Sequence, residues 1–195
     1  IITCLNNIIE KYKDIIFADI GSFVGFYAIY FSKLTHDKNK VYAIESNKLY
    51  CEDIKKSKEI NNIKNIEILE AILSDKNEEQ VFYREFAMNQ KNLKSSNFQN
   101  KKLFEEIKNN LKKNNTIQLD DLFLEEQQKP NILKIDVHGA EGKVIKGGRN
   151  FLKESVNIIL LELHSQNYLN IYSEGIKRKE VIAELNTIGF KTFMI

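Results

Sequence analysis

The segment Ile15–Phe26 constrains the fold of this chain more than any other part of the sequence. An apolar run of strand length, Ile15–Ile20, leads into glycines at positions 21 and 25, and an apolar helical pattern follows. Glycine lets the backbone approach a ligand or a neighbouring element without a Cβ in the way. The unpaired N–H groups at the start of the helix can receive polar ligand atoms. The pattern predicts a strand, a tight turn and a helix start at which a nucleotide-like cofactor can bind.

The rest of the chain continues this alternation of strands and helices. Strands are expected at residues 15–20, 41–45, 65–69, 131–137, 156–163 and 190–195, and helices at 1–12, 25–34, 47–60, 117–124, 141–152 and 176–188. Gly189 is the expected stop signal of the last helix. Such alternation is typical of an α/β fold with a mostly parallel sheet and helices on both faces. We expect one domain over residues 1–195, because a chain of this length can bury one proper core.

Residues 76–115 interrupt the alternation. They are rich in Asn, Lys and Gln, with one short strand expected at Val81–Tyr83 and one short helix near Lys101–Leu111. A long polar insertion in a compact domain is usually a lid, a binding loop or a flexible excursion. An ordered lid and a mobile loop are both left open.

The composition excludes several classes of protein. The 29 basic and 27 acidic residues leave a net charge of +2, which gives no case for nucleic-acid binding. Cys4 and Cys51 have no Cys or His at metal-ligand spacing, so no zinc site is expected. Two unpaired cysteines fit a reducing compartment. No apolar run approaches the roughly 20 residues of a membrane span, so we expect a cytoplasmic protein.

Acidic residues around the glycine turn narrow the choice of cofactor. Asp19 stands just before the turn, where a phosphate-binding loop would avoid a negative charge. A carboxylate there suits a cationic cofactor such as S-adenosylmethionine, which carries a sulfonium and an amino group. Glu45 closes the second strand, twenty residues after Gly25, where an acid can reach ribose hydroxyls. Glu70, at the end of the third strand, either meets the adenine ring or is a solvated acid.

A second group of reactive side chains follows the later strands. Lys134, Asp136 and His138 alternate, so they would share one face of a strand. Such groups in an apolar strand are costly unless they are paired or functional, and a Lys134–Asp136 ion pair is the structural alternative. Glu162 and His164 repeat the pattern at the end of the next strand. His164 can be a base or a hydrogen-bonded structural histidine.

Three motifs in these segments resemble those of the FkbM family of S-adenosylmethionine-dependent methyltransferases. They are Asp19-Ile-Gly21-Ser-Phe-Val-Gly25-Phe-Tyr, Val41-Tyr-Ala-Ile-Glu45 and Lys134-Ile-Asp136-Val-His138-Gly139-Ala140-Glu141. The resemblance implies a Rossmann-like class I methyltransferase fold with a seven-stranded sheet, whose last strand can be missing here. It also implies methyl transfer, commonly to a hydroxyl oxygen of a sugar in a surface polysaccharide or of a polyketide-type product.

The same resemblance implies two sets of site residues. The cofactor set comprises Asp19, Gly21, Ser22, Phe23, Gly25, Glu45, Ser46, Glu70, Ala71 and Asp136. The catalytic set comprises Lys134, Asp136, His138, Glu141 and His164. In this assignment the glycine turn and Asp19 hold the methionine portion, and Asp136 lies next to the sulfonium.

The sequence departs from the family pattern at two places. The family usually has Ala-Asn where this chain has Ser22-Phe23, so a polar contact is lost and Phe23 can pack against the cofactor site or cover part of it. The family usually has Glu where this chain has His138. That difference bears on substrate choice or on the catalytic base.

Transfer to a hydroxyl requires a group that takes the hydroxyl proton. Our hypothesis is that His138 or His164 does this, because they follow adjacent strands. No metal is expected, and a metal-assisted version would use Asp136 with Glu162. The expected partner is a small-molecule or glycan substrate, such as a sugar or polysaccharide precursor; whether the chain forms a homo-oligomer is left open.

Two rival functions are also considered. An NAD-dependent oxidoreductase is disfavoured by the charge of Asp19, which would face a pyrophosphate. A degenerate Rossmann-like module that only binds a partner would have its pocket blocked by Phe23.

Overall fold

The computed structural model describes residues 1–36, 38–81, 113–172 and 176–193, and its largest element is a parallel sheet of five strands. These strands are β1 (Phe17–Ile20), β2 (Val41–Glu45), β3 (Ile66–Glu70), β7 (Ile132–Ile135) and β8 (Ile158–Leu161). Their order is β3-β2-β1-β7-β8, and every pair is parallel. The chain winds outward from β1 in one direction and from β7 in the other. Ligands of open α/β sheets bind beyond the carboxyl ends of the strands at such a switch point.

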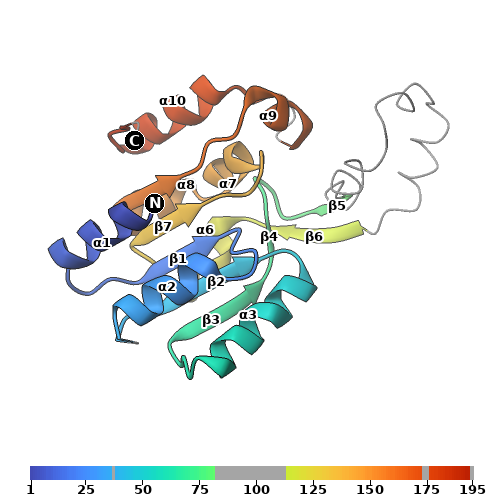
Figure 1. The fold of residues 1–195 in the computed structure, drawn as a ribbon. Coiled ribbons are helices and arrows are strands. Elements are labelled where there is room, and N and C mark those ends of the chain that lie inside the picture. The colour runs from blue at the N-terminus through green and yellow to red at the C-terminus, as the bar shows by residue number, and fades with distance from the viewer. Residues whose placement is uncertain (37, 82–112, 173–175, 194–195) are drawn as a thin grey trace.

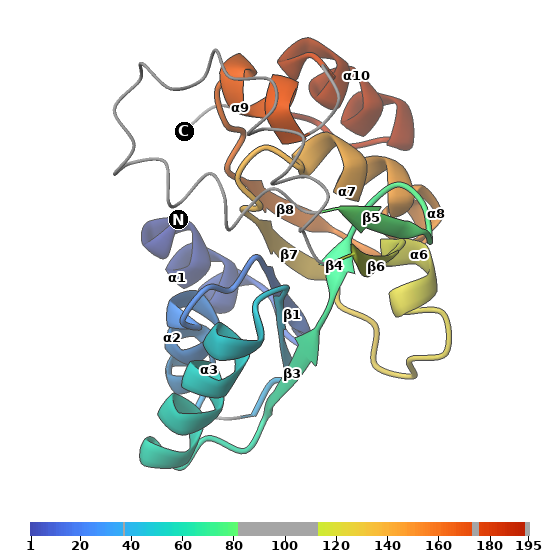
Figure 2. The same cartoon turned by 90° about the vertical axis from the view of Figure 1, so that its right-hand side faces the viewer.

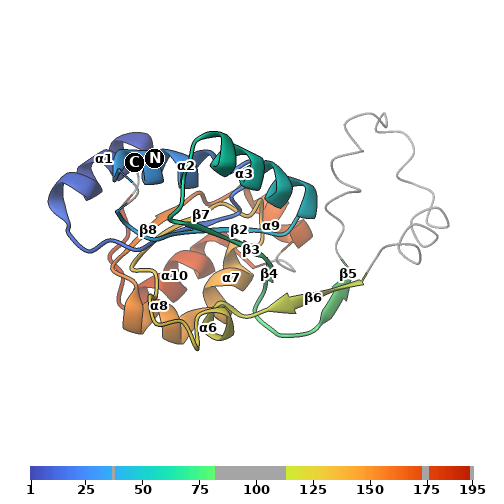
Figure 3. The same ribbon diagram turned by 90° about the horizontal axis from the view of Figure 1, so that it is seen from below.

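Helices cover both faces of this sheet, as Figures 1 and 3 show. On one face lie α1 (Ile2–Lys11), α2 (Phe26–Leu34) and α3 (Lys48–Ile60). On the other lie α6 (Leu119–Leu122), α7 (Glu141–Gly147), α8 (Arg149–Ser155) and α10 (Arg178–Ile188). Buried strand residues alternate between two apolar cores: Phe17, Val41 and Ala43 pack in the core with α1–α3, and Ala18, Ile20 and Ile44 in the core with α7, α8 and α10. The predicted α/β fold class is confirmed, with five strands rather than seven in the main sheet of the described residues.

A second, smaller sheet lies beyond the carboxyl end of β3, from which the chain continues into β4 (Ile72–Leu73), as Figure 2 shows. Its order is β4, β6 (Lys113–Ile117) and β5 (Glu79–Val81), with β4–β6 parallel and β5–β6 antiparallel. β5 and β6 therefore stand at the two ends of the predicted insertion. Neither β4 nor β6 was predicted from the sequence. The rest of the strand expected at Val81–Tyr83 and the helix expected near Lys101–Leu111 lie outside the described residues. The lid at 76–115 stays a prediction.

The helix expected over residues 141–152 is two helices, α7 and α8. Gly148 ends the first and precedes the second, with φ −117° and ψ 15°. A Cβ added at Gly147 would lie 2.0 Å from the carbonyl oxygen of Ser74, so the chain passes against the β4 segment at this break. The expectation of one continuous helix was wrong because tertiary packing interrupts it at the glycine pair.

The strand expected over residues 190–195 is absent from the described residues 190–193. Gly189 does end α10, in a left-handed conformation with φ +118°. Phe190 N donates to Leu185 O at 3.0 Å, which closes the helix end. The apolar character of Phe190 therefore serves the end of α10 and the adjoining core.

The segment between β8 and α10, for which no strand or helix was expected, contains α9 (Gln166–Tyr172). Among the described residues, no helix combines the length and apolar character that a bilayer crossing requires. Cys4 and Cys51 are free thiols.

Candidate functional site

A buried ion pair joins β1 to β7 beneath the start of α2. Asp19 and Lys134 are register partners, and Lys134 Nζ lies 3.2 Å from Asp19 Oδ1. Their side chains are 0% and 3% exposed. Asp19 Oδ2 accepts a hydrogen bond from Ala28 N at 3.2 Å. Since Ala28 lies in the first turn of α2, Asp19 satisfies one of the N–H groups that a helix start leaves unpaired.

Lys134 also holds the loops that follow both strands. Its Nζ lies 3.5 Å from Asp136 Oδ2 and donates to Gly21 O at 3.4 Å. It also stands 5.0 Å from the centre of the Tyr27 ring, a cation–π contact. The Lys134–Asp136 pair considered above as a structural alternative is therefore present, and Lys134 bridges two acids.

The burial of Asp19 removes the argument used above against an NAD-dependent oxidoreductase. Burial raises the pKa of Asp19, and the Lys134 ammonium opposes that shift. Lys134 compensates the charge of Asp19, and protein encloses the carboxylate completely. The argument that Asp19 alone would repel a pyrophosphate is therefore wrong, and its contact with a methionine portion stays a prediction.

The turn at Gly21–Gly25 is wedged between the ends of β2 and β7. The N–H groups of Gly21 and Ser22 both donate to Ile44 O, at 2.9 and 3.1 Å. Gly21 has φ +77°, and a Cβ added there would lie 1.9 Å from the carbonyl oxygen of Asp136. Both the backbone conformation and the lack of space require glycine at this position.

We expect Gly21→Ala to destabilise the protein more than Gly189→Ala does. Both positions have positive φ, which costs an L-residue about 1–2 kcal/mol. A Cβ at Gly189 meets nothing within 4 Å, whereas the Cβ at Gly21 meets backbone, and such overpacking costs about 1–3 kcal/mol more. Urea unfolding of both variants measures the difference. Equal losses would mean that the loops after β1 and β7 can separate freely.

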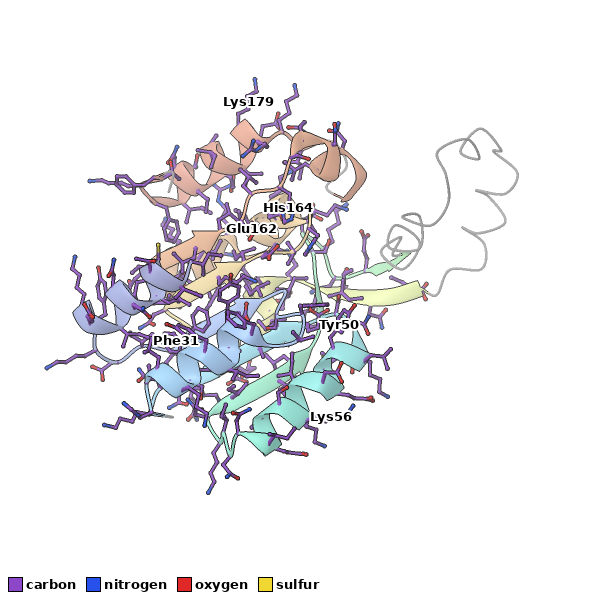
Figure 4. All side chains as sticks on the ribbon, viewed as in Figure 1. Phe31, Tyr50, Lys56, Glu162, His164 and Lys179 are labelled. Atoms are coloured by element: carbon purple, nitrogen blue, oxygen red, sulfur yellow. The ribbon has the colours of Figure 1, made fainter. Side chains whose placement is uncertain are left out.

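Phe23 adopts a left-handed conformation in this turn, with φ +53°. Its ring is 47% exposed and stands edge-on to Tyr50 of α3, with the ring centroids 4.5 Å apart. Beside it, Ser22 is buried and its Oγ donates to Asp19 O at 2.6 Å. Phe23 therefore packs toward α3, where Figure 4 labels Tyr50. Asn, the usual family residue here, adopts this conformation more readily than Phe.

Glu45 connects the glycine turn to the loop after β2. Its Oε2 accepts from Phe23 N at 2.8 Å, and its Oε1 accepts from Asn47 N at 2.9 Å and from Ser46 Oγ at 3.2 Å. The residue is buried. Its register partner on β3, Glu70, is exposed, and Ala71 N donates to Glu45 O at 3.1 Å. The predicted ribose and adenine residues thus lie together at the carboxyl ends of β2 and β3.

Two histidines and two acids meet beyond β7 and β8. His138 Nδ1 and His164 Nε2 lie 3.6 and 3.8 Å from Asp136 Oδ1. The two imidazole rings are 4.8 Å apart, centre to centre. His164 Nδ1 lies 2.8 Å from Glu141 Oε1, and that oxygen also accepts from Gly139 N at 2.9 Å. The residues of the predicted catalytic set are therefore neighbours in space; Figure 4 labels Glu162 and His164 just after β8.

The expectation that Lys134, Asp136 and His138 share one strand face was wrong in its geometry. β7 ends at Ile135, and His138 and Gly139 take φ of +53° and +107°. A turn rather than strand alternation brings His138 to Asp136. Glu162, which alternation placed with His164, is exposed.

Sequence reasoning missed Tyr27 beneath Lys134 and Tyr50 beside Phe23. Both lie in predicted helices, but the pattern does not show which helix side faces the turn.

The structure also has an open concavity of about 1020 Å³ at the amino ends of β2 and β3, lined in part by Lys38, Lys40, Lys55, Lys58 and Lys64. Because open α/β sheets bind ligands at their carboxyl edge, we assign the functional site to the opposite edge.

Comparison with known proteins identifies a matching family and solved structures with a similar fold. Residues 16–187 match the methyltransferase FkbM domain family. The solved structure of methyltransferase FkbM from Methylobacillus flagellatus KT is 15% identical with a TM-score of 0.50, over 76% of this chain and 33% of that one. Precorrin-6y C5,15-methyltransferase from Geobacter metallireducens GS-15 is 14% identical with a TM-score of 0.51, over 97% and 70%.

The chain spans about a third of the length of the Methylobacillus protein. No curated protein sequence matches this chain significantly. At these identities the likeness to the solved structures shows the fold alone. The family match covers most of the chain and includes all three motifs described above. The resemblance inferred from the sequence is thereby confirmed, and the chain belongs to the methyltransferase FkbM domain family.

Proposed function

We propose that this protein transfers a methyl group from S-adenosylmethionine to a hydroxyl oxygen of a sugar or polysaccharide precursor. The observation that carries the proposal is the meeting of two features at Asp136. Its backbone oxygen packs against the glycine turn at Gly21, and its carboxylate faces His138 and His164. A cofactor on the turn would therefore have proton-accepting groups close to its reactive end.

The cofactor assignment rests on the two loops that Glu45 joins. The carboxylate oxygens of Glu45 would accept hydrogen bonds from the ribose hydroxyls. The same oxygens already accept from the N–H groups of Phe23 and Asn47. Glu70 and Ala71 extend the same edge toward the place expected for adenine. Asp19 would act through the turn that it anchors, because it is enclosed by protein.

Methyl transfer is an in-line displacement at carbon. The C–S bond of the sulfonium breaks with its electron pair left on sulfur, and an oxygen lone pair of the acceptor forms the C–O bond. The protein must align this oxygen behind the methyl group, exclude water, and remove the hydroxyl proton. The acceptor hydroxyl would lose that proton beside Asp136, His138 and His164.

Calorimetry with S-adenosylhomocysteine tests the cofactor assignment. Micromolar binding supports it, preferential binding of NAD would indicate an oxidoreductase, and binding of neither would indicate an interaction module. Methyl transfer from labelled S-adenosylmethionine is then screened against nucleotide sugars and cell-surface glycans. Transfer only to nitrogen or carbon acceptors would reject the hydroxyl assignment.

A further inference from the structure

Three side chains of the site present ligand atoms to one small volume. Asp136 Oδ1, His138 Nδ1 and His164 Nε2 all lie within 4.8 Å of one another. The two distances to Asp136, 3.6 and 3.8 Å, are too long for direct hydrogen bonds. Ligands of one transition-metal ion at about 2.0–2.2 Å stand about 3–4 Å apart. The two distances from Asp136 fit atoms around a common ion better than atoms bonded to each other.

Glu141 fixes the orientation of the His164 ring. It is fully buried at the start of α7, and its Oε1 lies 2.8 Å from His164 Nδ1. A carboxylate only accepts, so Nδ1 carries the hydrogen and donates it. In the neutral imidazole, Nε2 then holds the lone pair, and it lies 3.8 Å from Asp136 Oδ1. Histidine ligands of metal ions are held by a carboxylate in this way.

The charges around the site leave room for a dication. Asp136 Oδ1 is buried and has no hydrogen-bond partner among the residues that the structure describes, although Lys134 stands 3.5 Å from the other oxygen. Asp19, Asp136 and Glu141 carry three negative charges against the single charge of Lys134. With neutral histidines these four groups sum to −2.

From this geometry we infer that Asp136, His138 and His164 bind a divalent transition-metal ion. Two imidazoles and one carboxylate suit Zn²⁺, Co²⁺ or Mn²⁺ better than Mg²⁺, which prefers oxygen ligands. The inference differs from the sequence-based expectation of no metal. It also differs from the metal-assisted alternative of Asp136 with Glu162, because Glu162 is exposed and is not one of the three ligands.

The inference deepens the proposed methyl transfer and rests on it for its chemical meaning. A bound dication lowers the pKa of a hydroxyl group that coordinates it. The acceptor O–H bond then breaks with the proton passing to solvent water, and the oxygen keeps the electron pair that forms the C–O bond. With the ion bound, the two imidazoles act as its ligands, and this role replaces that of proton acceptor, which they have in the proposed transfer without a metal.

The test is titration of the metal-free full chain with Co²⁺, followed by absorption, and with Zn²⁺, followed by calorimetry. We expect one equivalent to bind, and His138→Asn to weaken binding at least about tenfold. His36→Asn is the matched control. His36 is the only other histidine of the chain, and both residues have left-handed backbone, φ +52° and +53°, which Asn tolerates.

Equal weakening by His36→Asn, or no stoichiometric binding to the unaltered protein, would overturn the inference. Two further measurements separate it from the proposed function. Undiminished methyl transfer in a chelator, together with absent metal binding, rejects the metal site and leaves the transfer. Stoichiometric metal binding without S-adenosylhomocysteine binding retains the site and rejects the transfer.

Discussion

Lys134→Met is expected to destabilise the protein by about 3–5 kcal/mol, because it leaves a buried carboxylate without its partner. Asp19 is fully buried, and Lys134 Nζ is the cation beside it at 3.2 Å. The same ammonium contacts Asp136 and Gly21 O. Its loss therefore removes the link between the loops after β1 and β7. Denaturant unfolding at pH 8 measures the change.

The deficit should shrink as the pH falls. Burial raises the pKa of Asp19 and Lys134 lowers it, so removing Lys134 leaves burial less opposed. A carboxyl group with a higher pKa in the folded state binds more protons there than in the unfolded state. Stability is then kept at low pH and lost as pH rises from about 4, the unfolded pKa, through the folded pKa. We expect a smaller deficit at about pH 5 than at pH 8.

Lys40→Met is the matched control for this variant. Lys40 pairs with Glu67 at 2.7 Å, but the two side chains are 28% and 41% exposed. Removing such a pair costs under about 1 kcal/mol. The double variant Lys134→Met/Asp19→Asn should recover most of the loss, since the fully buried charge of Asp19 is then also gone and the amide oxygen can still accept from Ala28 N. A loss at Lys134 no larger than at Lys40, or no recovery in the double variant, would contradict this account.

The pairing of Asp19 with Lys134 shows what a single sequence can and cannot predict here. Strand alternation places each residue on one face of its own strand, and the glycine spacing correctly indicated the turn after β1. Nothing in the pattern says that β1 and β7, more than a hundred residues apart, are neighbours in register. From the sequence, Asp19 and Lys134 were therefore assigned to separate motifs, whereas in the structure they form one buried ion pair.

Local periodicity also fails where the chain leaves regular structure. His138 was placed by strand alternation, which stops at Ile135, and its left-handed conformation has no sequence signal as strong as a glycine. β4 has two residues, too short a pattern to recognise, and it pairs with β6. In contrast, the adjacent placement of His138 and His164 was predicted, because each follows an apolar strand and the two strands are consecutive in the expected order. These strands, β7 and β8, are neighbours in the sheet.

The second large effect is expected at His164, where we predict that His164→Gln lowers kcat for methyl transfer by about 10²–10⁴-fold. Its side chain is 15% exposed and faces Asp136 through Nε2, while Glu141 holds Nδ1. The His164 ring is therefore held on one side, with its other nitrogen 3.8 Å from Asp136. S-adenosylhomocysteine affinity should change little, because the residue acts on the acceptor side.

Glu141→Gln tests whether Glu141 orients the His164 ring through its charge or only packs against it. The amide keeps the size of the side chain but loses the charge that holds His164 Nδ1–H, so kcat should fall about 10–100-fold with little change in KM. Glu162→Gln makes the same chemical change two residues before His164, on an exposed side chain, and should leave kcat unaltered. Steady-state kinetics on the three variants, with circular dichroism to confirm folding, measures these effects. Near-full turnover in His164→Gln, or equal losses in the two glutamine variants of Glu141 and Glu162, would show that this histidine does not serve the transfer.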